Sequence, residues 1–171
     1  MIDISKFRPD IVYTIYIGST PEKVWQALTT AEFSRQYFSG FAIEADLKVG
    51  GAFIARAPDG TEHISGEVIE CDPPKKLTVT WNVNWPALVE KLGPTLVTYE
   101  IEQTGDAVKL TMLQSHDRPI SDDILSGGRA GWPAILSSLK SMLETGEAMV
   151  IPMKPPERML AALKELGIGM P

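Results

Sequence analysis

The chain has 171 residues, of which 44% are hydrophobic and 22% charged, and its formal net charge is −6. This length suits one domain with a substantial core, and the composition is typical of globular proteins. The acidic balance and the lack of a basic cluster exclude nucleic-acid binding through phosphate contacts. Cys71, the single cysteine, cannot form an internal disulfide. Because the sequence also shows no signal-like segment and no apolar run of membrane length, we expect a cytoplasmic protein without a membrane span.

The first elements are a strand and two short helices. Residues 11–17 are rich in β-branched and aromatic side chains, which predicts a strand. Ser19 or Thr20 then caps a helix with Pro21 at its first position, where no backbone N–H is needed. A second short helix is predicted over residues 31–37.

The middle of the chain, roughly residues 41–116, is a succession of strands separated by turns. The turn signals are Gly50-Gly51, Pro58-Asp59-Gly60-Thr61 and Asp72-Pro73-Pro74. Alternating apolar residues predict half-buried strands between these turns, most clearly at 77–83. A loop with one or two helical turns, at 84–94, interrupts the series.

A long helix is predicted from about Arg129 to Thr145, since apolar residues recur there at helical spacing. Gly127-Gly128 precedes the helix in this prediction and Gly146 ends it. The predicted fold is therefore α+β, with a curved sheet of six or seven antiparallel strands around the helix. The core face of sheet and helix is expected to contain Leu77, Val79, Trp81, Val97, Tyr99, Ile101, Leu110, Met112, Ile135 and Leu139.

We assign residues 1–146 to a single domain and residues 147–171 to a C-terminal tail with a short amphipathic helix. Three prolines of the tail lead into the amphipathic segment at 157–166. Apolar tail residues usually pack on a surface. We therefore expect the tail to dock on its own domain or, alternatively, to contact a second copy or a foreign partner.

Several short motifs occur in an order and spacing that resemble a known family. They are the stretch from Ser19 to Trp25, Gly50-Gly51, Gly66 to Leu77, Trp81, Val97 to Ile101, and Gly131 to Lys140. Over residues 11–146 the chain resembles the SRPBCC (START-like) superfamily. Within it, the chain is similar to the bacterial branch named after the C-terminal domain of the activator of the heat-shock-protein-90 ATPase. The resemblance implies a helix-grip fold, in which an antiparallel sheet wraps the last helix and encloses a cavity.

The resemblance implies no single activity, because the relatives include lipid carriers, polyketide cyclases and a chaperone-activating domain. Relatives often carry a histidine late in the strand that leads toward the final helix, where this chain has Gln114. His63 and His116 are the only histidines, and neither has metal-ligand spacing around it, so we predict no metal and no cofactor. His116 is the better catalytic candidate of the two, because it continues the alternation that brings Gln114 toward the cavity.

The expected ligand-binding residues are mostly those that face inward in a helix-grip fold. They are Phe38, Trp81, Trp85, Tyr99, Met112, Gln114, Trp132 and Leu136. Apolar walls with an occasional polar atom suit a mostly hydrophobic ligand that carries one oriented polar group.

Three functions agree with these features. The first is non-catalytic binding of a small hydrophobic molecule inside the fold. The second is a cyclase- or hydrolase-type enzyme in which His116 or Gln114, with Tyr99, moves a proton or polarises a carbonyl. The third is a protein-interaction role like that of the chaperone-activating relatives, with residues 84–94 and the tail as contact surfaces; a homodimer is one version of it.

Overall fold

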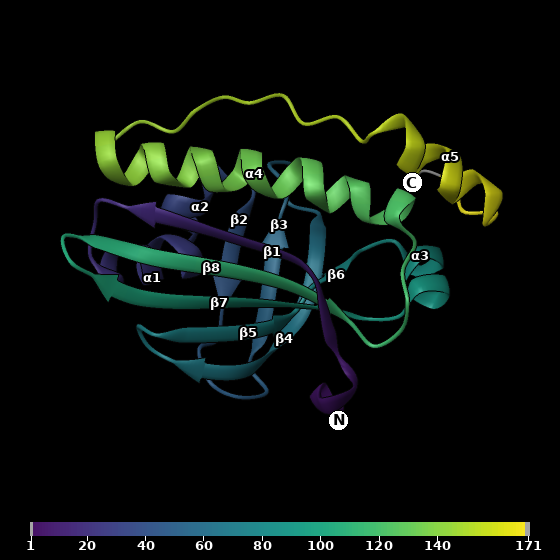
Figure 1. The fold of residues 1–171 in the computed structure, drawn as a ribbon, viewed down its shortest axis with the longest axis horizontal. Helices are drawn as coiled ribbons and strands as arrows, with labels where there is room; N and C mark the ends of the chain where they lie inside the picture. The colour runs from purple at the N-terminus through teal and green to yellow at the C-terminus, as the bar shows by residue number, and fades with distance from the viewer. Residues whose placement is uncertain (1, 170–171) are drawn as a thin grey trace.

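The computed structural model describes residues 2–169, which form a curved sheet around one long helix (Figure 1). The strands are β1 (Arg8–Ile17), β2 (Ala42–Ala45), β3 (Ala52–Arg56), β4 (Glu62–Asp72), β5 (Lys76–Thr80), β6 (Asn82–Val83), β7 (Thr95–Thr104) and β8 (Ala107–His116). The helices are a short 3-10 helix (Ile4–Lys6), α1 (Pro21–Thr29), α2 (Ala31–Tyr37), α3 (Pro86–Leu92), α4 (Asp122–Thr145) and α5 (Glu157–Glu165). None of the helices within residues 2–169 is both long enough and apolar enough to cross a membrane.

The eight strands form one antiparallel sheet in the order β1-β8-β7-β5-β4-β3-β2, and the short β6 pairs with β4. The sheet curves without closing, because β1 and β2 stand at opposite ends of this order. The prediction of an α+β fold with a curved antiparallel sheet and a C-terminal helix is confirmed.

The sheet has eight strands rather than the predicted six or seven, and β5 is more buried than predicted. The stretch 77–83 breaks at Trp81 into β5 and β6. The prediction that this stretch is half-buried is also wrong, because Thr78 and Thr80 are buried as well. β5 lies inside the sheet between β4 and β7, where the Thr78 hydroxyl lies 3.1 Å from that of Thr98. The hydroxyl of Thr80 accepts a hydrogen bond from the backbone N–H of Glu67 at 2.8 Å.

The predicted helices at the N-terminal end are confirmed, and their caps explain where they begin. The Thr20 hydroxyl accepts a hydrogen bond from the Lys23 backbone N–H at 3.3 Å, which satisfies one free donor of α1. Ser34 of α2 accepts a hydrogen bond from the Ile43 backbone N–H at 2.8 Å and so ties α2 to β2.

The long helix begins earlier than predicted. α4 starts at Asp122 rather than at Arg129, so Gly127-Gly128 lies inside the helix and not before it. The Ser121 hydroxyl caps the helix by accepting a hydrogen bond from the Ile124 N–H at 3.3 Å. Asp122 and Asp123 place negative charge at the positive end of the helix dipole. These capping signals outweigh the low helix propensity of two adjacent glycines.

Contacts with β1 compensate for the helix-breaking residues of α4. Pro133 has no N–H to donate to the carbonyl of Arg129, and the Tyr13 hydroxyl donates a hydrogen bond to that carbonyl instead, at 3.0 Å. A Cβ atom at position 128 would lie 2.7 Å from Cδ1 of Ile11. Glycine at this position therefore lets the helix approach the sheet closely.

The core lies between the concave face of the sheet and α4. Of the ten residues predicted to face it, nine are buried and Ile135 is partly buried. Phe53, Ile64 and Val68 of β3 and β4 extend this core toward the far edge of the sheet.

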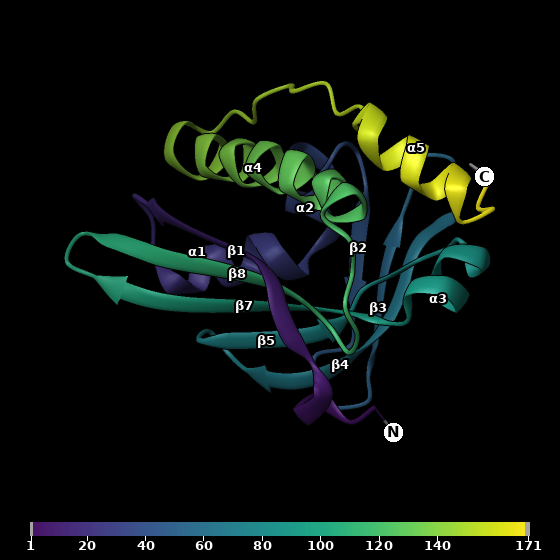
Figure 2. The same cartoon turned by 45° about the vertical axis from the view of Figure 1, so that its right-hand side comes forward.

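The tail folds back along the side of α4 that faces away from the sheet, and ends in α5 (Figures 1 and 2). The hydroxyls of Ser138 and Ser141 donate hydrogen bonds to the backbone carbonyls of Met149 and Glu147, at 2.8 and 2.7 Å. α5 packs on α4, and Leu163 and Ile168 are buried. The tail therefore contacts its own domain.

Candidate functional site

A cavity of about 590 Å³ lies at one end of the grip, between the sheet, α3, the N-terminal half of α4 and the tail. Figures 1 and 2 show α3 and α5 near one another at this end of the molecule. The volume falls within the range of pockets that hold small molecules, roughly 300–1,000 Å³. The tail supplies part of the wall through residues 151–155, Met159 and Leu163.

Aromatic rings from three different elements form much of the inner wall. The ring of Trp81 lies between those of Phe38 and Trp132, with centroid distances of 5.8 and 5.4 Å. Trp85 reaches the same cavity from the residue that precedes α3. These three tryptophans place large apolar surfaces around one space.

One chain of hydrogen bonds runs through this wall. The indole N–H of Trp132 donates to Oε1 of Gln114 at 2.7 Å. Nε2 of Gln114 lies 3.5 Å from Nε2 of His116, and Nδ1 of His116 lies 2.7 Å from Oδ2 of Asp10. His116 is only 6% exposed. The imidazole of His116 is thus buried, lies next to the carboxylate of Asp10 and borders the cavity.

The position of Asp10 follows from an irregularity in the sheet. β1 pairs with β8 in a register that shifts between Pro9 and Ile11, so Asp10 has no partner in the ladder. An unpaired residue of this kind can turn its side chain away from the regular alternation. Asp10 consequently meets His116, although Arg8 is the residue opposite His116 in the register.

The structure brings some of the predicted site residues together and separates others from them. Those that border the cavity are Phe38, Trp81, Trp85, Gln114, Trp132 and His116. Tyr99, Met112 and Leu136 are buried in the core and do not border it. Burial raises the pKa of the Tyr99 phenol, which keeps this group protonated.

Three parts of the site were not predicted from the sequence. They are Asp10, the tail residues of the cavity wall, and the stacked rings of Phe41 and His63. The two rings stack with a centroid distance of 4.5 Å, and burial lowers the pKa of His63. The apolar residues of the tail were a usable signal for its part of the wall. No sequence signal marks the register shift that orients Asp10, because its cause lies in the pairing of two distant strands.

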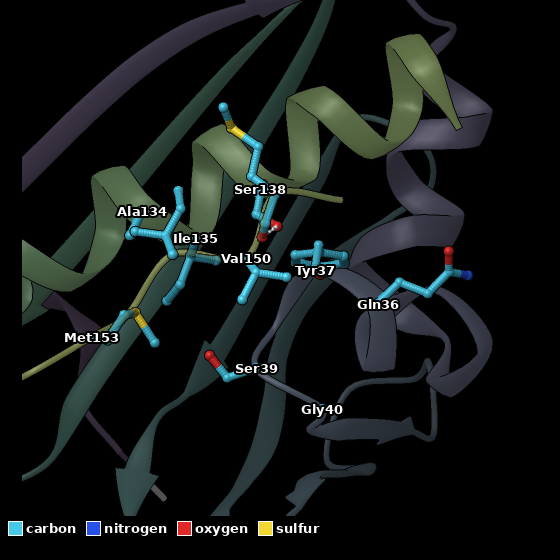
Figure 3. A pocket seen from close by; sticks show the side chains of 11 residues that line it. Gln36, Tyr37, Ser39, Gly40, Ala134, Ile135, Ser138, Val150 and Met153 are labelled. Atoms are coloured by element: carbon cyan, nitrogen blue, oxygen red, sulfur yellow. Dashed lines mark hydrogen bonds between the residues drawn. The ribbon is translucent and has the colours of Figure 1, made fainter. Parts of the chain in front are cut away.

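A second, smaller hollow of about 240 Å³ lies between α2, α4 and the tail (Figure 3). Tyr37, Ile135 and Val150 gather around it. Ile135 and Met153 border both hollows, so the tail segment near Met153 lies between them. This volume is below the usual range for ligand pockets.

Within residues 2–169 no group of three or more histidine, cysteine or acidic side chains is arranged to hold a metal ion. Cys71 is a free cysteine, and burial and the charge of Asp72 raise the pKa of its thiol.

A curved antiparallel sheet that grips a C-terminal helix is the architecture of the helix-grip proteins of the SRPBCC superfamily. The chain belongs to the family described as "Activator of Hsp90 ATPase homolog 1-like protein", whose model matches residues 19–144. No curated protein sequence matches the chain.

Among solved structures, protein MLL2253 from Mesorhizobium loti is 28% identical, with a TM-score of 0.61 over 78% of this chain and 96% of that one. The Aha1 dimer from Colwellia psychrerythraea is 23% identical, with a TM-score of 0.66 over 81% of this chain and 98% of that one. CalU16 from Micromonospora echinospora is 20% identical, with a TM-score of 0.63 over 91% and 82%. The last two likenesses establish the fold alone.

Proposed function

We propose that the protein binds a small hydrophobic molecule, without catalysis, in the cavity of about 590 Å³. The observation that carries this proposal is the composition of the cavity wall. The rings of Phe38, Trp81 and Trp132 surround a single space together with apolar residues of α3, α4 and the tail, with few polar side chains among them. Apolar walls around such a volume favour ligands that lose apolar surface to water contact on binding.

Small residues occupy the part of α4 that borders the cavity. Gly127, Gly128, Ala130 and Gly131 all lie there. A Cβ atom at Gly131 would meet no atom within 4 Å, so the space beside this residue is open. A large side chain at this position is therefore expected to fill part of the cavity without displacing the core.

Native mass spectrometry of the purified protein should detect a retained apolar compound. Calorimetric titration with naphthalene should then show saturable binding to the wild-type protein. Gly131→Phe is expected to weaken this binding at least tenfold. Ser137→Phe places the same ring at an exposed position of α4 that does not border the cavity, and should bind like wild type. Absence of any retained compound together with no binding of naphthalene would overturn the proposal.

The buried pair of Asp10 and His116 favours a second candidate, an enzyme of the cyclase or hydrolase type in the same cavity. A carboxylate that orients an imidazole is an arrangement used for general acid–base catalysis. Hydrolysis of 1-naphthyl acetate tests this candidate, because its product is easily measured. A wild-type rate that matches that of His116→Phe would reject it.

A homodimer and a cytoplasmic location remain predictions. A strip of the tail exposes Met149, Val150 and Met153, and Val150 is 98% exposed. Such a strip supports a contact between two copies. Sedimentation analysis over a range of concentrations should show a dimer that Val150→Asp disrupts. The single free cysteine supports a reducing compartment.

A further inference from the structure

We infer that the ligand is an apolar ring compound that carries a hydroxyl group, and that this hydroxyl donates a hydrogen bond to Nε2 of His116. The inference rests on the proposed function, since it names the chemical class that the cavity selects. Hydrogen bonds connect the side chains of Asp10, His116, Gln114 and Trp132 beside the cavity.

The network assigns the proton positions of His116. The Asp10 carboxylate accepts a hydrogen bond, so Nδ1 of His116 carries a proton. Trp132 can only donate, so the atom of Gln114 that it contacts at 2.7 Å is the oxygen. Gln114 therefore turns its NH2 group toward His116. With a donor facing it, Nε2 is assigned as the acceptor nitrogen of the ring.

The acceptor atom of His116, Nε2, has only a weak hydrogen-bond partner. Its contact with the Gln114 NH2 group is 3.5 Å long, at the outer limit of a hydrogen bond. His116 is otherwise nearly inaccessible, and a buried acceptor with a weak partner costs free energy. The same side chain borders the cavity, so a ligand is placed to supply the missing donor.

A hydroxyl group matches both polar atoms at once. Its hydrogen can take the single lone pair of His116 Nε2 in place of the long Gln114 contact, and its oxygen can accept an N–H of the Gln114 amide. A ligand carbonyl would find only the Gln114 donor. A ligand carboxylate would face the acceptor nitrogen with the negative charge of Asp10 behind it. A neutral hydroxyl is therefore the favoured polar group.

The surroundings of this polar pair favour a ring as the body of the ligand. Trp132, which holds Gln114, is also part of the aromatic wall with Trp81 and Phe38. Aromatic walls pack well against flat ring systems in offset or edge-to-face geometry. The hydroxyl and the ring are thus recognised by adjoining parts of one wall.

Three probes of similar shape test this inference by calorimetric titration: 1-naphthol, 1-methoxynaphthalene and naphthalene. The methoxy compound retains the oxygen acceptor but has no hydrogen to donate. Wild-type protein should bind 1-naphthol roughly 3- to 10-fold more tightly than 1-methoxynaphthalene, the ratio expected for one net hydrogen bond. In His116→Phe the two probes should bind equally, while naphthalene still binds.

Two further variants separate recognition from folding. His116→Asn keeps a polar group near Asp10 and has no atom at the place of Nε2, so it should also lose the preference for 1-naphthol. Ser137→Phe, at an exposed position of α4 that does not border the cavity, should keep the ratio between the two probes. Urea unfolding should establish that each variant is folded.

The outcomes distinguish the two proposals. If naphthalene binds but wild type shows no preference for 1-naphthol, the hydroxyl inference fails and the proposed function stands. A preference that survives in both variants of His116 would also overturn the inference. If none of the three probes binds and the purified protein retains no apolar compound, the proposed function fails as well.

Discussion

The two halves of α4 lie against the same sheet and yet differ in what fills the space beneath them. Leu136, Leu139 and Met142 of the C-terminal half are buried in the core. The N-terminal half has Gly127, Gly128 and Gly131 instead, and borders the cavity. The space beside Gly127 and Gly128 is already occupied by Met159 and Ile11, whereas the space beside Gly131 is open, so Gly131 is the position of α4 at which a missing side chain leaves room for the cavity.

The N-terminal half of α4, which borders the cavity, is called the hollow half, and the C-terminal half is called the filled half. The hollow half depends on elements that the filled half does not need. α3 and α5 complete the cavity wall there, whereas the filled half is sealed by core side chains and is crossed only by the start of the tail, whose carbonyls bond to Ser138 and Ser141. If this difference is correct, substitutions in the filled half should mainly change stability. Those in the hollow half should mainly change binding.

The largest expected effect is the truncation of Leu139, which is fully buried in the filled half. Leu139→Ala should lower the free energy of unfolding by about 3–4 kcal/mol, because it removes packed methyl groups and leaves a void. Leu125→Ala, which enlarges the existing cavity, should lower it by about half as much. Urea unfolding of both variants measures the difference, and equal losses would contradict the comparison.

Removal of the tail should have the next largest effect. Deletion of residues 147–171 exposes the surface that Leu163 and Ile168 now cover, and should lower the free energy of unfolding by about 2 kcal/mol. It should also weaken probe binding, because one cavity wall is lost. Thermal unfolding and calorimetry measure the two effects.

Gly127→Val tests the contact between α5 and α4 without removing the tail. A Cβ atom at Gly127 would collide with Sδ of Met159, so valine should push this side chain out of its place and loosen the packing of α5 while the rest of the fold persists. Faster proteolysis of the tail in this variant is the expected result. For the deletion of residues 147–171, unchanged melting and unchanged probe binding would show that the tail contributes neither to stability nor to binding.

Two glycines of α4 should respond oppositely to the same substitution. Gly131→Ala should raise the free energy of unfolding by up to about 1 kcal/mol, because alanine favours helix and the space beside it is open. Gly128→Ala should lower it by about 1–2 kcal/mol, since the added methyl group would lie 2.7 Å from Cδ1 of Ile11. Chemical unfolding of this matched pair checks both signs.

The smallest expected effect concerns pH at the filled end of the helix. Hydrogen bonds from Lys140 and then from the Gly18 N–H lower the pKa of Glu144 below its ordinary value of about 4.5. A carboxylate whose pKa is lower in the folded protein stabilises it above the unfolded pKa, and this contribution is lost as the pH falls. Glu144→Gln should therefore remove up to about 1 kcal/mol at neutral pH and less at about pH 3. Identical pH dependence in wild type and variant would contradict this assignment.

The regular parts of the fold were predictable because their signals are local. Alternation predicted the inward face of β7 and β8, and Thr20-Pro21 predicted the start of α1. The start of α4 was mispredicted because two adjacent glycines resemble a loop when the contacts that require them are unknown. Gly128 is understood only once Ile11 is seen beside it.

The site was predictable to a smaller extent for the same reason. Trp81, Gln114 and Trp132 follow from inward-facing periodicity. Tyr99 and Met112 have the same periodicity but are buried in the core and do not border the cavity, although the Tyr99 ring lies 6.4 Å from that of Trp132. Asp10 depends on a shift in strand register, which no local pattern encodes.

A crystal structure of the protein with 1-naphthol is the most direct test of the central claim that the hollow half of the grip is a ligand site. The account predicts the ring beside Trp81 and Trp132, with its hydroxyl oxygen within hydrogen-bond distance of Nε2 of His116. A cavity that the tail has collapsed to fill, or a ring bound elsewhere on the molecule, would contradict it.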